Sequence, residues 1–435
     1  MEVFAEEALQ KARALDEKRK AGQSTGKLHG VVIALKDVLC YKGHRVTAAS
    51  HILKGFTATY NATAVQRLLD EEAIIIGTCN CDEFAMGSSN ENSFYGNTLN
   101  ALDETRVPGG SSGGSAVAVQ ANLCMASLGS DTGGSVRQPA DFCGVVGFKP
   151  GYGRISRYGL IAYGSSFDQI GIFSKNIPDI ALLLEVMAGT DEYDSTASTA
   201  PVPAYSAGLQ EKTTGLRIGY LSEALEHPGL DPEMAGTIGS WIKTMQGQGH
   251  DVQPIDFGLI DYIVPTYYIL STAEASSNLS RFDGVRYGYR DSRPGLELTD
   301  FYKETRSAGF GKEVKRRILL GTFVLSAGYF DAYFTQAQKV RKQLFDKTQL
   351  IFKDFDIILL PTVPSPAFRI GEKTDDPIAM YLADIYTVYA NLAGIPAISI
   401  PLFTHSSGMP FGIHAMSNQL SELYLLRFAH QLANV

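Results

Sequence analysis

Three scarcities in the sequence exclude several classes of protein. Five cysteines in 435 residues are an odd number and do not suggest a disulfide framework. The apolar runs are short, as at Ala73–Gly77, against the ~18–20 residues needed to span a bilayer. No charged segment followed by an apolar one opens the chain, so no secretion signal is predicted. Together these features favour a reducing compartment, the cytoplasm or an organelle matrix, and no contact with a membrane.

Positive charge is also scarce. Lys and Arg number 38 against 46 Asp and Glu, which gives a net charge of −8. An acidic chain is poorly suited to binding a nucleic-acid backbone on its own, which leaves RNA contact to a partner. With 45% hydrophobic and 19% charged residues, the composition is that of a globular protein.

Apolar segments alternate between strand-like and helix-like patterns along the whole chain, which predicts an α/β fold. The sequence predicts one domain over 1–435, in which helices cover a mixed central sheet on both sides. Strands are expected at Gly30–Leu35, Ala73–Thr78, Cys124–Leu128, Gly215–Leu221, Asp356–Leu360 and Ala397–Pro401. Helices are expected at Glu2–Lys20, Thr63–Glu72, Ala116–Gln120, Asp179–Ala188, Pro232–Gln248, Phe334–Thr348 and Met380–Ala393.

One segment is unusually rich in glycine. Between Arg106 and Gly171, 14 of 66 residues are glycine, about 21%, against 43 of 435, about 10%, in the whole chain. Glycine permits positive φ angles and close approach of the backbone to a ligand. Because apolar runs interrupt this segment, we expect a functional system of tight turns between a helix and a strand, and not a flexible linker.

Phosphate and metal sites do not fit this segment. No G-x-x-x-x-G-K-[ST] loop is present, and Gly151–Ser156 departs from G-x-G-x-x-G at its third glycine. Cys79 and Cys81 lack C-x₂-C spacing, and the eight histidines include no H-E-x-x-H. The sequence therefore predicts no metal site and no cofactor bound by this chain.

Serine chemistry fits better. Ser135 follows consecutive glycines, and the backbone N–H groups of Thr132, Gly133 and Gly134 are candidates for an oxyanion hole beside its hydroxyl. A serine needs a base, and no histidine lies between His51 and His227.

A lysine can supply the missing base. Lys36 directly follows an apolar strand, and burial would lower its pKa and leave part of it neutral. Ser111, in a second glycine turn, is the candidate for passing the proton from Ser135 to Lys36. We expect Asp168 to support the loops without a catalytic role.

These residues resemble the amidase signature family. Its hallmark is a Gly-Gly-Ser-Ser-Gly-Gly-Ser loop, then Asp-Thr-Gly-Gly-Ser-Val-Arg-x-Pro, with a lysine upstream, and it is found here at Gly109–Ser115, Asp131–Pro139 and Lys36. The resemblance implies that Ser135 is the nucleophile, that Ser111 is a relay serine after a cis bond from Gly110, and that Lys36 is the base. It also implies a catalytic core over about 28–175 and a glutamine pocket with peripheral helices over about 176–435, with termini shorter than usual.

Within that family, three segments are similar to the A subunits of tRNA-dependent amidotransferases: Asp82–Ser93, Ala273–Tyr287 and Arg316–Tyr329. This resemblance implies that glutamine is hydrolysed and that its ammonia converts Glu-tRNA(Gln) to Gln-tRNA(Gln), Asp-tRNA(Asn) to Asn-tRNA(Asn), or both. The implied partners are B and C subunits, with aminoacyl-tRNA held mainly by B. ATP and Mg²⁺ would be used by the partner subunit.

Glutamine recognition needs a cation for the α-carboxylate and an anion for the α-ammonium. By similarity we expect Arg317, with its neighbour Arg316 as the alternative, then Asp384, and Tyr268 lining the pocket. Two other hypotheses stay open at this point. One is a stand-alone amidase acting on small amides, whose pocket would lack the Arg/Asp pair. The other is a non-catalytic assembly subunit.

Overall fold

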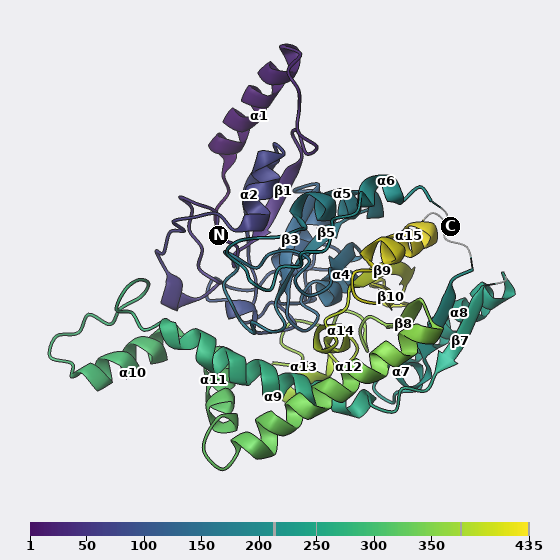
Figure 1. The fold of residues 1–435 in the computed structure, drawn as a ribbon. Helices are drawn as coiled ribbons and strands as arrows, with labels where there is room; N and C mark the ends of the chain where they lie inside the picture. The colour runs from purple at the N-terminus through teal and green to yellow at the C-terminus, as the bar shows by residue number, and fades with distance from the viewer. Residues whose placement is uncertain (212–214, 249, 375, 434–435) are drawn as a thin grey trace.

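One mixed sheet forms the centre of the computed structural model, which describes residues 1–211, 215–248, 250–374 and 376–433 (Figure 1). Ten strands belong to the sheet across these residues. In spatial order they are β2 (Ile74–Cys79), β1 (Val32–Lys36), β3 (Ala126–Asp131), β5 (Gln169–Ser174), β4 (Val146–Lys149), β9 (Ala397–Thr404), β10 (Pro410–Met416), β8 (Ile357–Pro361), β6 (Arg217–Leu221) and β7 (Asp251–Ile255).

The sheet is parallel at both edges and antiparallel in the middle. β1 runs parallel to β2 and β3, and β6 runs parallel to β7 and β8. Every residue of β3, β4, β5 and β8 is buried, so both faces of the sheet are covered there. These strands therefore lie in the core, and even their polar residues, such as Ser130 and Asp131, are buried.

Helices supply the cover on both faces. They are α1 (Ala5–Lys20), α2 (Thr63–Asp70), α3 (Gly113–Gln120), α4 (Arg137–Cys143), α5 (Ile177–Met187), α6 (Tyr205–Gly208), α7 (Ser222–Leu225), α8 (Pro232–Gly247), α9 (Ile260–Asn278), α10 (Leu298–Gly309), α11 (Lys312–Val324), α12 (Gln336–Asp354), α13 (Pro377–Leu382), α14 (Val388–Leu392) and α15 (Glu422–Ala433). In Figure 1, α9, α11 and α12 lie together along one side, and α5, α6 and α15 lie on the other. Within the described residues, no helix is both long and apolar enough to cross a bilayer.

The predicted α/β fold with a single mixed sheet is confirmed, and so are the six predicted strands, within a few residues at their ends. In the glycine-rich segment, α3 and β3 are the predicted helix and strand. The segment also contributes β4, β5 and α4, which the sequence patterns did not reveal.

The predicted continuous helix over Met380–Ala393 is wrong. The structure has two short helices, α13 and α14, with a turn at Ala383–Thr387 between them. Backbone bonds in this turn run from residue i to residue i−3, as at Asp384 to Tyr381. The β-branched Ile385 and Thr387 weaken helix propensity here, and the Thr387 hydroxyl donates to Gly133 O as well as to Asp384 O within the turn.

Replacing a glycine between β9 and β10 would test how closely these two strands pack. Gly412 sits at a register shift between β9 and β10, where an added Cβ would lie 1.9 Å from Ile400 O. We expect Gly412→Ala to lower the free energy of unfolding by about 1–3 kcal/mol, because the backbone must shift. Gly236→Ala, in α8 with nothing within 4 Å, is the matched control and should raise it by about 0.5–1 kcal/mol. Equal urea midpoints for the two variants would contradict this packing.

Candidate active site

The neighbouring parallel strands β1 and β3 bring the predicted catalytic residues together. β1 ends at Lys36, and β3 ends at Asp131, from which the turn over 132–136 leads into α4. The second serine turn, over 109–112, leads into α3. Ser112 N donates to Ser135 O at 3.2 Å, so the two serine turns lie side by side at the carboxyl ends of the strands.

Lys36 is fully buried and donates hydrogen bonds to two hydroxyl groups. Its Nζ donates to Ser111 Oγ at 2.7 Å and to Ser130 Oγ at 2.9 Å. Burial lowers the pKa of Lys36 from its ordinary 10.5 to about 8, and nearby groups that include the Asp82 and Asp131 carboxylates limit that fall. A substantial share of this amine is therefore neutral at mildly alkaline pH and able to accept a proton from Ser111.

The three side chains differ in depth. Lys36 and Ser111 are 0% exposed, whereas Ser135 is 8% exposed. The Gly110–Ser111 peptide bond is cis, as the family resemblance implied. Ser135 is thus the most exposed of the three, which suits a nucleophile at the mouth of the site, with Ser111 and Lys36 both buried. The chemical roles themselves stay predictions.

A buried ion pair shapes the turn that carries Ser135. Asp131 accepts hydrogen bonds from Gly134 N at 2.9 Å and Val136 N at 3.2 Å, and it pairs with Arg137 at 2.8 Å. Both partners of the ion pair are 0% exposed. Burial alone would raise the pKa of Asp131, but the charge of Arg137 and its hydrogen bonds hold that pKa well below the ordinary range. The carboxylate therefore stays ionised, and the turn stays closed around it.

The predicted oxyanion hole needs one correction. Gly134 N–H donates to Asp131, so it is already engaged. The N–H groups of Thr132 and Gly133 have no acceptor among the described residues and remain the candidate donors. Glycine is required in this turn because a Cβ on Gly133 would lie 2.5 Å from the Tyr267 ring.

Asp168 also contacts the turn that carries Ser135. It accepts from Thr132 Oγ1 at 2.6 Å and from the N–H groups of Tyr163 and Gly164. Burial raises the pKa of Asp168 to about 6, against these hydrogen bonds. The supporting position expected for Asp168 matches these contacts.

Arg317 and Arg316, the two candidates for the glutamine carboxylate, both pair with Glu313 but differ in burial. The Arg317 side chain is 4% exposed and that of Arg316 is 37% exposed. Arg317 Nε donates to Glu313 Oε1 at 2.9 Å, and Nη1 donates to Tyr163 Oη at 2.8 Å. Its guanidinium also lies 5.3 Å from the centre of the Tyr268 ring. The geometry therefore favours Arg317.

Asp384 and Tyr268 complete the same cluster. Asp384 Oδ2 accepts from Tyr268 Oη at 3.0 Å and from Ser88 Oγ at 2.8 Å, and burial raises the pKa of Asp384 to about 6. A cavity of about 50 Å³ is lined in part by Arg317 and Arg316, and it has room for a few water molecules or a carboxylate group. The three predicted substrate residues are thus brought together, with both signs of charge present.

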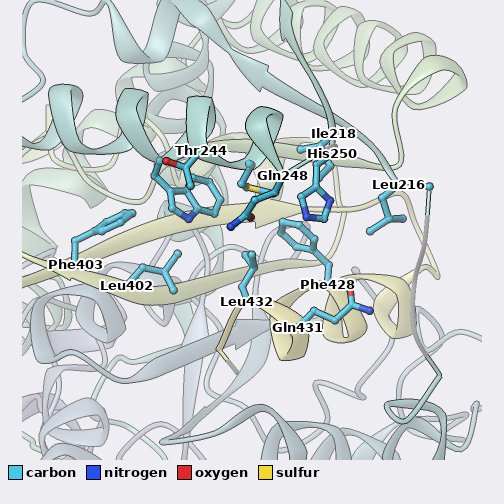
Figure 2. Close-up of a pocket in the computed structure, with 13 residues that line it drawn as sticks. Leu216, Ile218, Thr244, Gln248, His250, Leu402, Phe403, Phe428, Gln431 and Leu432 are labelled. Atoms are coloured by element: carbon cyan, nitrogen blue, oxygen red, sulfur yellow. The ribbon is translucent and has the colours of Figure 1, made fainter. Parts of the chain in front are cut away.

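A larger cavity lies elsewhere. Figure 2 shows this space of about 490 Å³ between α8, β6, β9 and α15. Its lining residues are Gly215, Leu216, Ile218, Trp241, Thr244, Met245, Gln248, His250, Leu402, Phe403, Phe428, Gln431 and Leu432. None of these is a predicted site residue, and the lining has no serine beside a base, so this cavity is not the candidate active site.

Sequence reasoning missed several residues of the site. Ser130 holds Lys36, Thr387 Oγ1 donates to Gly133 O at 2.8 Å, and Glu313 pairs with Arg317. Ser130 directly precedes the Asp131–Pro139 motif and could have been nominated. The spacing of Val314, Arg317, Gly321 and Val324 could have placed Arg317 on the buried face of its helix.

This arrangement fits a serine hydrolase with a lysine base. The family described as Amidase matches residues 1–426, and the chain belongs to that family. The curated relatives are more specific in name. The chain is 52% identical over 431 residues to the A subunit of the glutamyl-tRNA(Gln) amidotransferase of Chlorobium luteolum, covering 99% of this chain and 88% of that protein. It is 50% identical over 423 residues to the protein of the same name from Koribacter versatilis, covering 97% and 88%.

Solved structures agree with the fold. The A subunit of the glutamyl-tRNA(Gln) amidotransferase from Thermotoga maritima is 40% identical, with a TM-score of 0.80 and coverage of 94% of this chain and 83% of that one. A 6-aminohexanoate cyclic dimer hydrolase is 27% identical, with a TM-score of 0.82 and coverage of 99% and 88%. The same architecture therefore supports related hydrolases with different substrates.

The pKa of Lys36 predicts a pH profile. If neutral Lys36 is the base, the phosphonylation of Ser135 by a fluorophosphonate probe, in which the serine oxygen displaces fluoride, should rise with pH and level off above about 8, because the protonated amine accepts no proton. Lys36→Ala should lower the rate by roughly 10²–10⁴-fold and remove this step from the profile. A variant that keeps the step near pH 8 would assign it to another group.

Proposed function

We propose that this chain hydrolyses glutamine and supplies the ammonia to a tRNA-dependent amidotransferase, as its A subunit. One observation carries the proposal: the serine–lysine site adjoins a buried cluster in which Arg317 and Asp384, of opposite charge, both contact Tyr268. Thr387, three residues after Asp384, donates to Gly133 O in the nucleophile turn. Free glutamine has a carboxylate for Arg317, an ammonium for Asp384 and an amide for Ser135.

The proposed reaction uses the contact between Lys36 and Ser111 and the more exposed position of Ser135. Ser135 Oγ attacks the side-chain carbonyl carbon of glutamine while its proton passes to Ser111, whose own proton passes to Lys36. The oxyanion is stabilised by the N–H groups of Thr132 and Gly133. The C–N bond breaks, ammonia leaves with a proton returned through Ser111, and a water molecule then hydrolyses the ester to glutamate.

The partners follow from the relatives, which are named as subunits of an amidotransferase. We propose B and C subunits, of which B holds Glu-tRNA(Gln) or Asp-tRNA(Asn) and uses ATP with Mg²⁺ to activate the terminal carboxylate. The acidic net charge of −8 suits a protein that does not hold tRNA itself. A cytoplasm or an organelle matrix would provide these substrates.

The two other hypotheses fit less well. A stand-alone amidase for small amides has no use for a buried Arg/Asp pair, and both residues are present in one cluster. A non-catalytic assembly subunit has no use for a buried lysine that contacts the relay serine, and that contact is intact.

Removing the nucleophile separates the two half-reactions. In the complex reconstituted with B and C subunits, Ser135→Ala should lower glutamine hydrolysis by at least ~10³-fold. Amidation of Glu-tRNA(Gln) from added ammonium should continue, because the partner carries that step. Glutamate release and Gln-tRNA formation are measured together. Loss of both activities in a complex that still assembles would give Ser135 a different role.

The two arginines provide a matched pair for substrate binding. Arg317→Met should raise KM for glutamine roughly 10- to 150-fold with a smaller change in kcat, because a buried, charge-assisted contact to the carboxylate is lost. Arg316→Met, on the exposed side of the same helix, should change KM less than threefold. Arg317→Lys, which keeps the charge without the planar fork, should give an intermediate KM. The opposite ranking of Arg316 and Arg317 would reverse the assignment.

A further inference from the structure

A short chain of buried hydrogen bonds joins the two halves of the site. Gly110 N donates to Gln138 Oε1 at 2.9 Å, and Gln138 Nε2 donates to Ser88 O at 2.7 Å. Ser88 Oγ then donates to Asp384 Oδ2 at 2.8 Å. We call these two side chains, Gln138 and Ser88, the Gln138–Ser88 bridge. It runs from the backbone beside the relay serine to the carboxylate proposed to bind the ammonium of glutamine.

The bridge is buried and tightly packed. Gln138 is 0% exposed, Ser88 is 3% exposed and Asp384 is 8% exposed. A Cβ on Gly109 would lie 2.6 Å from Gln138 Oε1, so the amide has no free space on that side. Gln138 belongs to the first turn of α4, and its N–H donates to Gly134 O in the nucleophile turn. A displacement of Ser88 therefore bears directly on Gln138 and on the Gly110–Ser111 peptide.

The segment that carries Ser88 is held at its base by Asp82. The Asp82 carboxylate accepts from Asn90 N at 2.9 Å and from Asn92 N at 3.1 Å, and Asp82 N donates to Ser111 O at 3.1 Å. The same loop is thus anchored to the relay serine at one end and to Asp384 at the other. These bonds hold the backbone on both sides of Ser88 close to the relay serine.

We propose that Gln138 and Ser88 are positioning residues through which ammonium binding at Asp384 sets the position of Ser111, so that acylation is fast when an α-ammonium is bound. This inference rests on the proposed glutaminase function and deepens it. An amide without an α-ammonium leaves Asp384 without its cation, so only the bonds of the bridge itself hold the Gly110–Ser111 peptide in position. The bridge therefore makes the site selective for glutamine in kcat as well as in KM.

A double-mutant cycle in the reconstituted complex tests this role. Ser88→Ala removes the bond to Asp384 and should raise KM for glutamine roughly 10- to 150-fold and also lower kcat. Gln138→Met keeps the side-chain volume, removes both amide bonds and should lower kcat roughly 3- to 12-fold. In the double variant the kcat effect of Ser88→Ala should disappear, because the path from Asp384 to Ser111 is already broken. Ser88→Thr, which keeps the hydroxyl, should restore KM to within a few-fold of the wild type.

A control and a second probe complete the experiment. In α8, far from the site in sequence, Gln246 Nε2 donates to Val252 O of β7. Gln246→Met removes this comparable amide bond and should leave kcat and KM within twofold of the wild type. A fluorophosphonate probe reports on Ser135 without an ammonium group, and Gln138→Met should slow its reaction roughly 3- to 12-fold. Equal kcat effects of Ser88→Ala in both backgrounds, or a wild-type probe rate in Gln138→Met, would overturn the proposal. A wild-type complex that reacts with the probe but not with glutamine would overturn the proposed function instead, while the probe still tests Gln138.

Discussion

The buried ion pair between Asp131 and Arg137 is the interaction on which the site depends most. Asp131 closes the nucleophile turn by accepting from Gly134 and Val136, and Arg137 begins α4 immediately after that turn. Arg137 also donates to Thr387 O at 2.7 Å and to Asn391 Oδ1 at 2.7 Å. The pair therefore ties the serine turn to the later part of the chain that carries Asp384. Breaking a buried pair by removing one partner typically costs about 3–5 kcal/mol, because the other charge is left uncompensated.

Burial acts differently on the charges of this site. Asp131 stays ionised despite its burial because Arg137 lies against it. Burial lowers the pKa of Lys36 to about 8, because the ammonium bonds to the neutral hydroxyl groups of Ser111 and Ser130. Asp131 thus keeps its charge and holds the nucleophile turn, whereas Lys36 can gain or lose a proton near pH 8. Arg317 and Asp384 differ in the same way. Arg317 has an ion-pair partner in Glu313, whereas Asp384 has none among the residues that the structure describes, and burial raises its pKa to about 6. A bound ammonium would keep Asp384 ionised.

Local motifs explain what could be predicted from the sequence. Lys36, Ser111 and Ser135 each lie in a short pattern that suggests their chemistry, and the alternation of apolar runs is enough for an α/β fold. The partners that position them could not be found in this way, because Ser88 and Asp384 are 296 positions apart and Arg137 and Asn391 are 254 apart. The turn that splits α13 from α14 was missed because the apolar pattern of Met380–Ala393 continues through it. The Thr387 hydroxyl in that turn bonds to Gly133 O, 254 positions away, a contact that no local pattern reveals.

The most direct test of the account is glutamate release from glutamine by the purified chain, alone and then with B and C subunits, ATP and Glu-tRNA(Gln). The account predicts release that rises when the partners and their substrates are added, together with transfer of the amide nitrogen to tRNA. Ammonia released from simple amides at the same rate with or without partners would contradict it, and so would a chain that never forms a glutamyl ester on Ser135.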